Sequence, residues 1–159
     1  MIVRFGKDGI LYYFCSRFFK KETLNMDILQ EIKDYLAECR VFYLATVDGD
    51  QARVRPFGVS EIYNGRLYLM TAKSKDVFKQ LVANPQFELS ATKDNGAEWI
   101  RVSGKLVNDD DREMKQFILD QNPELKQFYQ ADDNMAAMYI TDGEARFFSY
   151  SDPERRVKF

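Results

Sequence analysis

The sequence predicts a mainly β (α+β) domain in which six or seven antiparallel strands form a closed or nearly closed barrel with flanking helices. Short runs of β-branched and aromatic residues recur along the chain, and turn sequences rich in Gly, Asn and Asp separate them. Only a few segments have the 3.6-residue apolar period of a helix. A closed sheet is favoured because closure leaves no strand edge exposed to solvent.

The first elements are a helix and a meander of three strands. Residues 27–39 predict the helix, since their apolar side chains recur on one face. Residues 41–47 predict the first strand, which ends at an Asp-Gly-Asp turn, and residues 52–62 predict the second. The Asn-Gly pair that follows tolerates positive φ, so it predicts a tight turn into a third strand at residues 66–71.

The remaining elements are a short helix, two hairpins and a pair of helices. Residues 74–85 predict the short helix, with Ser74 as its N-cap and a proline as its stop. Residues 87–107 predict a hairpin that turns in a Lys-Asp-Asn-Gly-Ala sequence. Residues 110–121 predict a helix, and an Asn-Pro pair starts another directly after it. Residues 136–150 predict a last hairpin, which turns at Asp-Gly-Glu.

Composition excludes several classes of function. The 159 residues suffice for one domain, and a net charge of −2 gives no electrostatic footprint for nucleic acid or for an anionic membrane. The chain has no histidine, which excludes Ser-His-Asp and Cys-His catalysis, His-ligated metals and haem with a proximal histidine. Two cysteines, Cys15 and Cys39, are too few for a disulfide framework, so a reducing cytoplasm is expected. The acidic run at residues 109–111 suits a helix start better than a metal site.

Residues 1–25 differ in character from the rest of the chain. Their apolar run, Ile10–Cys15, is shorter than a membrane span or a signal-peptide core, and no small-residue cleavage site follows it. One interpretation is a strand or an amphipathic surface anchor. We favour another: the codons for residues 20–22, Lys-Lys-Glu, can form a purine-rich ribosome-binding sequence shortly before Met26. The hypothesis is that translation starts at Met26 and that residues 26–159 form the domain.

The segment Gln-Ala-Arg-Val-Arg-Pro-Phe-Gly-Val, residues 51–59, puts positive charge where its pattern predicts a strand. Arg53, Arg55 and Phe57 alternate, so they share one face of that strand. Like charges on one face repel, and Pro56 cannot donate to a ladder. An arginine on an inward face needs an anion, and phosphate suits its bidentate fork. The alternative is that both arginines are solvated or paired with Glu61 or Asp50 on an open sheet face.

A second cationic element follows the third strand. Thr71 ends that strand, and Ser74 and Lys75 open the next helix, whose N-terminus presents free N–H groups to an anion. The Asn-Gly turn joins the second and third strands, so we expect Arg55 and this helix start to converge on one phosphate. The alternative is that Lys75 is an ordinary surface lysine.

The order of these motifs resembles the pyridoxamine 5′-phosphate oxidase-like family of FMN-binding split barrels. The motifs are "ATVDG", "RVRPF" and a helix with the pattern K-x-x-x-x-x-L-x-x-NP, followed by "EWIRVSGKLV", and the resemblance covers residues 28–150. It implies a six-stranded antiparallel split β-barrel, a homodimer, and FMN bound at the subunit interface. The abundance of aromatic residues, thirteen Phe and nine Tyr, suits an apolar interface between subunits.

The resemblance also implies a set of cofactor-binding residues. By position, Arg55 corresponds to the arginine that contacts the FMN phosphate, and Val54, Pro56 and Phe57 line the isoalloxazine. The segment Thr71–Lys75 corresponds to the phosphate-holding turn, although its lysine lies two residues from the family position. Trp99 and Arg101 lie on the strand that reaches the flavin from the partner subunit, although the pattern around Trp99 alone favours the core. The full set is Arg53, Val54, Arg55, Pro56, Phe57, Thr71, Ser74, Lys75, Trp99 and Arg101.

The function implied is a cytoplasmic FMN-dependent oxidoreductase of an unidentified small molecule, with reduced nicotinamide as a candidate electron donor. Flavin N5 would carry the hydride chemistry, and no catalytic side chain is assigned. True pyridoxamine phosphate oxidases grip their product with a C-terminal arginine and histidine. This chain lacks that motif, so vitamin B6 oxidation is rejected as the leading function. The absence of histidine also argues against the histidine-bearing nitroimidazole reductases and the haem-binding relatives. Alternatives are a non-catalytic flavin carrier or redox sensor, and a protein that binds a deazaflavin or another phosphorylated ligand.

Overall fold

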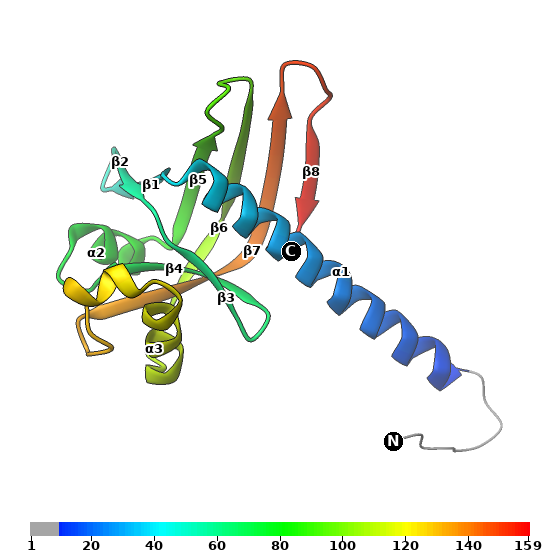
Figure 1. The fold of residues 1–159 in the computed structure, drawn as a ribbon, viewed down its shortest axis with the longest axis horizontal. Helices are drawn as coiled ribbons and strands as arrows, with labels where there is room; N and C mark the ends of the chain where they lie inside the picture. Colours follow the sequence, from blue (N-terminus) through cyan, green and yellow to red (C-terminus); the bar gives the residue numbers. More distant parts are fainter. Residues whose placement is uncertain (1–9) are drawn as a thin grey trace.

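One antiparallel sheet and its covering helices make up the fold (Figure 1). The computed structural model describes the backbone of residues 10–159 and the side chains of residues 22–159. In chain order the elements are α1 (Ile10–Cys39), β1 (Phe42–Asp48), β2 (Gln51–Phe57), β3 (Ser60–Tyr63), β4 (Arg66–Ala72), α2 (Asp76–Ala83), β5 (Gln86–Thr92), β6 (Glu98–Asp109), α3 (Arg112–Gln121), the 3₁₀ helix η1 (Pro123–Gln127), β7 (Met135–Ser149) and β8 (Arg155–Lys158).

The sheet has eight strands and is open. Its order is β2-β1-β5-β6-β7-β4-β3, and β8 pairs with β7. The predicted fold class, an antiparallel α+β split barrel, is confirmed. The predicted strand number of six and the closed or nearly closed ladder are not, because the sheet has eight strands and its two end strands do not pair. The two ends of the sheet, β2 and β3, are consecutive in the chain and are joined through Gly58 and Val59. The two end strands are therefore linked by the polypeptide chain and not by backbone hydrogen bonds between them.

The strand expected at residues 52–62 is two strands. β2 pairs with β1, and β3 pairs with β4, so the chain leaves one end of the sheet and enters the other at Gly58 and Val59. The tight turn between β3 and β4 is confirmed, with positive φ at Asn64 and Gly65. β2 is an edge strand, so it has no partner strand on its free side. A proline, which has no N–H to donate, is tolerated in such a strand.

The hairpin expected at residues 136–150 is instead the single long strand β7. It pairs with β6 from Glu98–Ser149 to Asp109–Ala137, and the register shifts near Gly104. Asp142 does adopt positive φ, but a bulge absorbs it and the strand continues. A Cβ on Gly104 would lie 2.8 Å from the carbonyl oxygen of Thr141, so the two backbones approach closely at this point. The short strand β8 was not anticipated.

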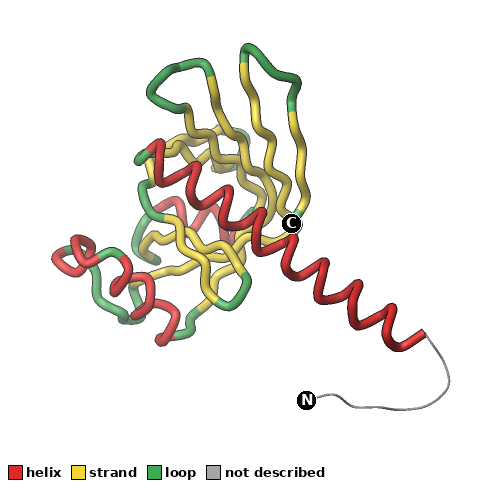
Figure 2. Tube along the Cα trace, turned by 45° about the vertical axis from the view of Figure 1, so that its right-hand side comes forward, coloured by secondary structure: helices red, strands yellow, loops and turns green. Residues whose placement is uncertain are grey.

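Helix α1 begins at Ile10, not near residue 27 as expected. The run Ile10–Cys15 is helical, which rules out the strand interpretation, and the helix extends past the sheet in both views (Figures 1 and 2). The predicted apolar stripe is confirmed: Leu29, Ile32 and Leu36 are buried against the inner face of the sheet. No helix within the described part of the chain is long and apolar enough to cross a membrane.

Two apolar clusters hold the fold together. The larger joins α1 and α2 to the inner faces of the strands, and it includes Phe42, Leu44 and Ile100. The smaller lies between α3 and the opposite face of β4 and β7, around Met114 and Met135. β4 is thus covered on both sides, which explains why nearly all its side chains are buried.

A chain that begins at Met26 is expected to fold as the full chain does. Among the side chains described in α1, Leu24 is 59% exposed and Met26 is 40% exposed, and the first buried residue is Leu29. We expect the midpoint of thermal unfolding, with saturating FMN, to change by less than about 2–4 °C, the shift that ~1 kcal/mol produces in a chain of this size. A larger loss would show that residues 1–25 pack on the domain and would contradict the Met26 hypothesis.

Candidate cofactor site

Arg55 lies in a half-buried polar cluster between β1, β2 and α2. Its guanidinium donates to Thr46 Oγ1 at 2.6 Å and to Gln80 Oε1 at 2.7 Å. It also lies 3.2 Å from the backbone carbonyl oxygens of Leu44 and Arg53. The Thr46 hydroxyl donates to the same Gln80 oxygen at 2.7 Å, so threonine and glutamine hold the arginine together. All of these acceptors are neutral.

The charge of Arg55 has no acidic partner among the side chains of residues 22–159. Burial, and secondly the charge of Arg53, lower the pKa of Arg55 from its usual value. Arg53 differs: it is 52% exposed and its Nε lies 3.2 Å from Asp48 Oδ2. The solvated or paired alternative therefore describes Arg53, whereas Arg55 keeps a positive charge that only an added anion would balance.

The register of β1 and β2 divides the predicted residues between two faces. Arg55 lies opposite the buried Leu44, and Arg53 lies opposite the buried Thr46, so both arginines are on the inner face. Phe57 is also on this face, where its ring packs on Phe42 with centroids 6.0 Å apart. It contributes to the core more than to an open site.

The outer face of the same two strands is apolar except for the hydroxyl of Tyr43. Val54 lies opposite Ala45, and Pro56 lies opposite Tyr43. Val54 is 63% exposed and Tyr43 is 55% exposed. The face is made of Tyr43, Ala45, Val47, Ala52, Val54 and Pro56, and we call it the β1–β2 outer face. Contiguous exposed apolar surfaces are typical of binding or association sites.

Trp99 and Arg101 lie on this outer side of the sheet. The ladders place Arg101 opposite Ser90, which lies opposite Tyr43. Trp99 is half-buried and stacks on Phe148, with ring centroids 5.0 Å apart and planes 5° apart. The core position that its pattern favours is therefore wrong. Arg101 donates from Nε to Glu88 Oε1 at 2.6 Å, so its charge is already paired.

The start of α2 departs from the expected N-cap. Lys75, not Ser74, occupies the cap position, and its side chain makes no capping hydrogen bond. The backbone N–H of Ser74 donates to Asn134 Oδ1 at 3.1 Å. Thr71 is buried within β4 and lies opposite Ala136.

The expected route by which Arg55 meets this helix is wrong. The Asn-Gly turn brings β3 beside β4, while β2 lies at the other end of the sheet. Arg55 nevertheless reaches α2, because its guanidinium bonds Gln80 in the middle of that helix. The structure thus brings Arg55 to the helix that Lys75 opens, with no direct contact between the two cations.

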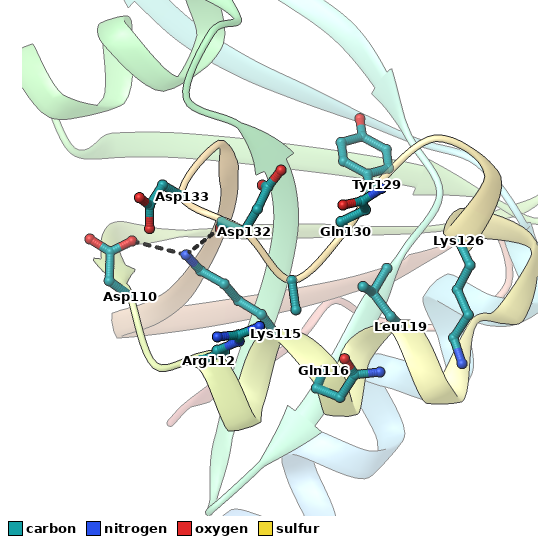
Figure 3. Close-up of a pocket in the computed structure, with 11 residues that line it drawn as sticks. Asp110, Arg112, Lys115, Gln116, Leu119, Lys126, Tyr129, Gln130, Asp132 and Asp133 are labelled. Carbon is teal, nitrogen blue, oxygen red and sulfur yellow. Dashed lines mark hydrogen bonds and ion pairs between the residues drawn. The ribbon is translucent and has the colours of Figure 1, made fainter.

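The connection between β6 and β7, residues 110–134, borders the same region. It forms a cavity of about 570 Å³ between α3, η1 and the following loop (Figure 3). Lys115 is 3% exposed there, and its ammonium lies 3.2 Å from Asp110 Oδ1 and 3.1 Å from the carbonyl oxygen of Asp132. Lys73 also lies 2.8 Å from Asp110 Oδ1, and its hydrogen bond is the main cause of the lowered pKa of Asp110.

Of the acidic run at residues 109–111, Asp111 serves the helix start as expected, whereas Asp109 accepts from the Tyr68 hydroxyl and Asp110 pairs with Lys73 and Lys115. The Asp111 carboxylate accepts from the backbone N–H groups of Glu113 and Met114 at the first turn of α3. Within residues 22–159, no group of three or more Asp, Glu or Cys side chains is placed to hold a metal ion.

Sequence reasoning missed Thr46, Gln80, Tyr129 and Asn134. The first two did leave a signal: Thr46 follows Phe42 and Leu44 at inward positions of its strand, and Gln80 lies on the buried stripe of α2. A polar residue at an inward position needs a polar partner. Tyr129 and Asn134 gave no such signal, because only the fold brings the β6–β7 connection, to which both belong, next to the start of α2.

The chain is similar in sequence and in structure to known proteins. A family model described as pyridoxamine 5′-phosphate oxidase matches residues 28–142. The structure is similar to that of a NimC/NimA family protein from Clostridium acetobutylicum, with 40% sequence identity, a TM-score of 0.83, and coverage of 87% of this chain and 96% of that one. No curated protein matches the chain.

Two more distant structures show the same fold. One is a pyridoxamine 5′-phosphate oxidase-related, FMN-binding protein from Nostoc punctiforme, at 14% identity and a TM-score of 0.56, with coverage of 82% of this chain and 85% of that one. The other is a heme-binding protein from Mycobacterium smegmatis, at 13% identity and a TM-score of 0.61, with coverage of 78% and 57%. The family model spans most of the chain, and the 40% identical structure covers nearly all of it. The chain belongs to the pyridoxamine 5′-phosphate oxidase-like family.

Proposed function

We propose that the protein binds FMN, with the phosphate at Arg55 and the start of α2. The observation that carries the proposal is the half-buried guanidinium of Arg55, which has only neutral partners. A phosphate monoester supplies nearly two negative charges and suits the planar arginine fork. The start of α2 adds the ammonium of Lys75 and the positive end of the helix dipole.

The flavin ring would lie around the edge of β2. β2 pairs on one side only, so its other side offers unpaired backbone groups to a ligand. Arg55 lies on the inner face of this edge strand and Val54 and Pro56 lie on its outer face, so one elongated ligand can contact both faces. Val54 and Pro56 would then meet the isoalloxazine, and Phe57 would support the strand from the core.

A homodimer is the second part of the proposal. The β1–β2 outer face is apolar and exposed, and a second copy would cover it. Trp99 and Arg101 lie on the same side of the sheet, so they are the residues we assign to the contact with the flavin of the partner subunit. A site shared between subunits would be incomplete in a monomer.

The activity we propose is that of a cytoplasmic flavin-dependent oxidoreductase of a small molecule, with reduced nicotinamide as electron donor. Bound FMN supplies the hydride and electron chemistry. The chain's own residues bind the phosphate, orient the ring and exclude water, and none of them is assigned to proton transfer. Without a histidine the chain lacks one of the residues that bind the product in pyridoxamine phosphate oxidases, so we do not propose that reaction.

The colour of the purified protein tests the proposal. We expect the absorbance spectrum of a bound flavin, and a released cofactor with the mass of FMN. Steady-state oxidation of NADH or NADPH then separates an enzyme from a carrier, because a carrier binds FMN without turnover. A colourless protein that FMN cannot load, or a released deazaflavin, would contradict the proposed cofactor.

A further inference from the structure

The β6–β7 connection packs on the turn that precedes α2. The backbone N–H of Lys73 donates to the carbonyl oxygen of Asn134 at 2.7 Å, and the N–H of Ser74 donates to the Asn134 side chain at 3.1 Å. The Lys73 ammonium lies 2.8 Å from the Asp110 carboxylate. The turn is therefore held by a segment distant in sequence, and its geometry depends on that segment.

Lys75 differs from its neighbouring lysines in the kind of partner it has. The surrounding lysines that pair with an aspartate are Lys73, Lys79, Lys115 and Lys126. The ammonium of Lys75 instead donates to the Tyr129 hydroxyl oxygen at 2.7 Å and lies 5.5 Å from the centre of the Tyr129 ring. Among the side chains of residues 22–159, no carboxylate pairs with Lys75. A phenol carries no charge at neutral pH, so Tyr129 holds this cation without neutralising it.

Tyr129 is itself fixed in place. Its backbone N–H donates to the carbonyl oxygen of Leu125 at 2.9 Å, at the end of η1. The side chain lines the cavity beside α3, and its hydroxyl points away from that helix (Figure 3). The phenol is thus presented to Lys75 by the β6–β7 connection, whose backbone is held at η1 as well as at the turn before α2.

We propose that Tyr129 is the positioning residue for Lys75: it holds the ammonium at the start of α2, ready for the phosphate of the ligand. The inference rests on the proposed function, which places that phosphate at the same helix start. A free lysine side chain loses rotamer freedom when it binds an anion, and that loss weakens binding. A partner that restrains the chain beforehand, and leaves its charge intact, reduces the loss.

Flavin fluorescence titrations of four proteins test the inference: the wild type, Tyr129→Phe, Lys75→Ala and the double variant. We expect Tyr129→Phe to weaken FMN binding by roughly 3–10-fold, the range that one lost hydrogen bond gives. Riboflavin, which has no phosphate, should bind all four proteins alike. In the Lys75→Ala background the tyrosine substitution should add nothing, because the two side chains act as one unit.

Tyr63→Phe is the matched control. Its ring packs on Phe117 with centroids 5.1 Å apart and it lies away from α2, so we expect wild-type binding of both flavins. Three results would overturn the inference: unchanged or tighter FMN binding by Tyr129→Phe, an equal loss for riboflavin, or a loss that persists without Lys75. If Arg55→Ala and Lys75→Ala also bind FMN as the wild type does, the proposed phosphate site is wrong and the inference fails with it. If those two variants lose affinity and Tyr129→Phe does not, only the inference fails.

Discussion

Arg55→Ala is expected to weaken FMN binding by about 10–150-fold, because charge-assisted hydrogen bonds contribute roughly 1.5–3 kcal/mol and each ~1.4 kcal/mol is tenfold. The structure adds a reason for an effect in this range. Arg55 has only neutral partners, so a phosphate would be its first anionic one. Riboflavin should bind the wild type poorly and be nearly indifferent to the substitution. Fluorescence titrations of both flavins against both proteins give the measurement.

Arg53→Ala is the control for charge alone. Arg53 is on the same face of β2, but it is exposed and paired with Asp48, so its removal should have a smaller effect. If the two variants lose equal affinity for FMN, the binding depends on the overall positive charge of β2 and not on a specific contact with Arg55. If Arg55→Ala binds FMN as tightly as the wild type, the phosphate site proposed here is wrong.

Gln80 gives a second approach to the same site. Gln80→Glu would place a carboxylate where a neutral oxygen now accepts from Arg55 at 2.7 Å. The new ion pair would compete with the phosphate, so FMN should bind more weakly while riboflavin binding stays unchanged. Gln80→Met removes the acceptor without adding charge and should have the smaller effect. Thermal unfolding of both variants checks that the buried cluster has not unfolded.

The elements that sequence predicted well are those set by local signals. The apolar stripe of α1 and the turn at Asn64 and Gly65 each depend on residues close together in the chain, and both are confirmed. The break between β2 and β3 was not predicted, because no Asn-Gly or Asp-Gly turn separates the two strands and Gly58 alone does not distinguish a break from a bulge within one strand. What separates the two strands is the choice of partner, β1 or β4, and that choice is made by the whole sheet.

The long strand β7 shows the same limit. Asp142 adopts the positive φ that a turn would need, but the hairpin predicted from this signal is wrong. The chain does not reverse there: β7 stays paired with β6 on both sides of the register shift, from Ser149 opposite Glu98 to Ala137 opposite Asp109. A turn signal and a bulge signal are alike in sequence, and only the partner strand distinguishes them.

The candidate site divides along similar lines. The inner-face position of Arg55 followed from alternation within one strand, and the structure places it there. The same alternation puts Val54 and Pro56 on the other face of the strand, where the structure has them. The edge position of β2, which would let one ligand contact both faces, is set by the sheet order and not by local sequence. Gln80 on α2 accepts a hydrogen bond from Arg55 on β2. This contact between a helix and a sheet could not be predicted from the sequence, because it depends on how the two elements pack.

Val54→Asp is expected to convert a wild-type dimer into a monomer. Val54 lies at the centre of the β1–β2 outer face, where it is 63% exposed and is opposite Ala45. If a second copy covers this face, the substitution buries an unpaired carboxylate, which costs several kcal/mol. We therefore expect the dimer dissociation constant to rise by at least about 100-fold, since each ~1.4 kcal/mol is tenfold. Sedimentation velocity at micromolar concentration distinguishes the two states.

Val82→Asp is the matched control for this substitution. Val82 is 64% exposed, but it lies on α2, which packs on the opposite side of β1 through Gln80 and Thr46. The two variants therefore add the same charge at equally exposed valines, and only the one on the β1–β2 outer face should dissociate the dimer. FMN binding should fall in Val54→Asp as well, because a site shared between subunits loses the partner's residues. A monomeric wild type, or a Val54→Asp variant that remains dimeric, would show that this apolar face is not the interface between subunits.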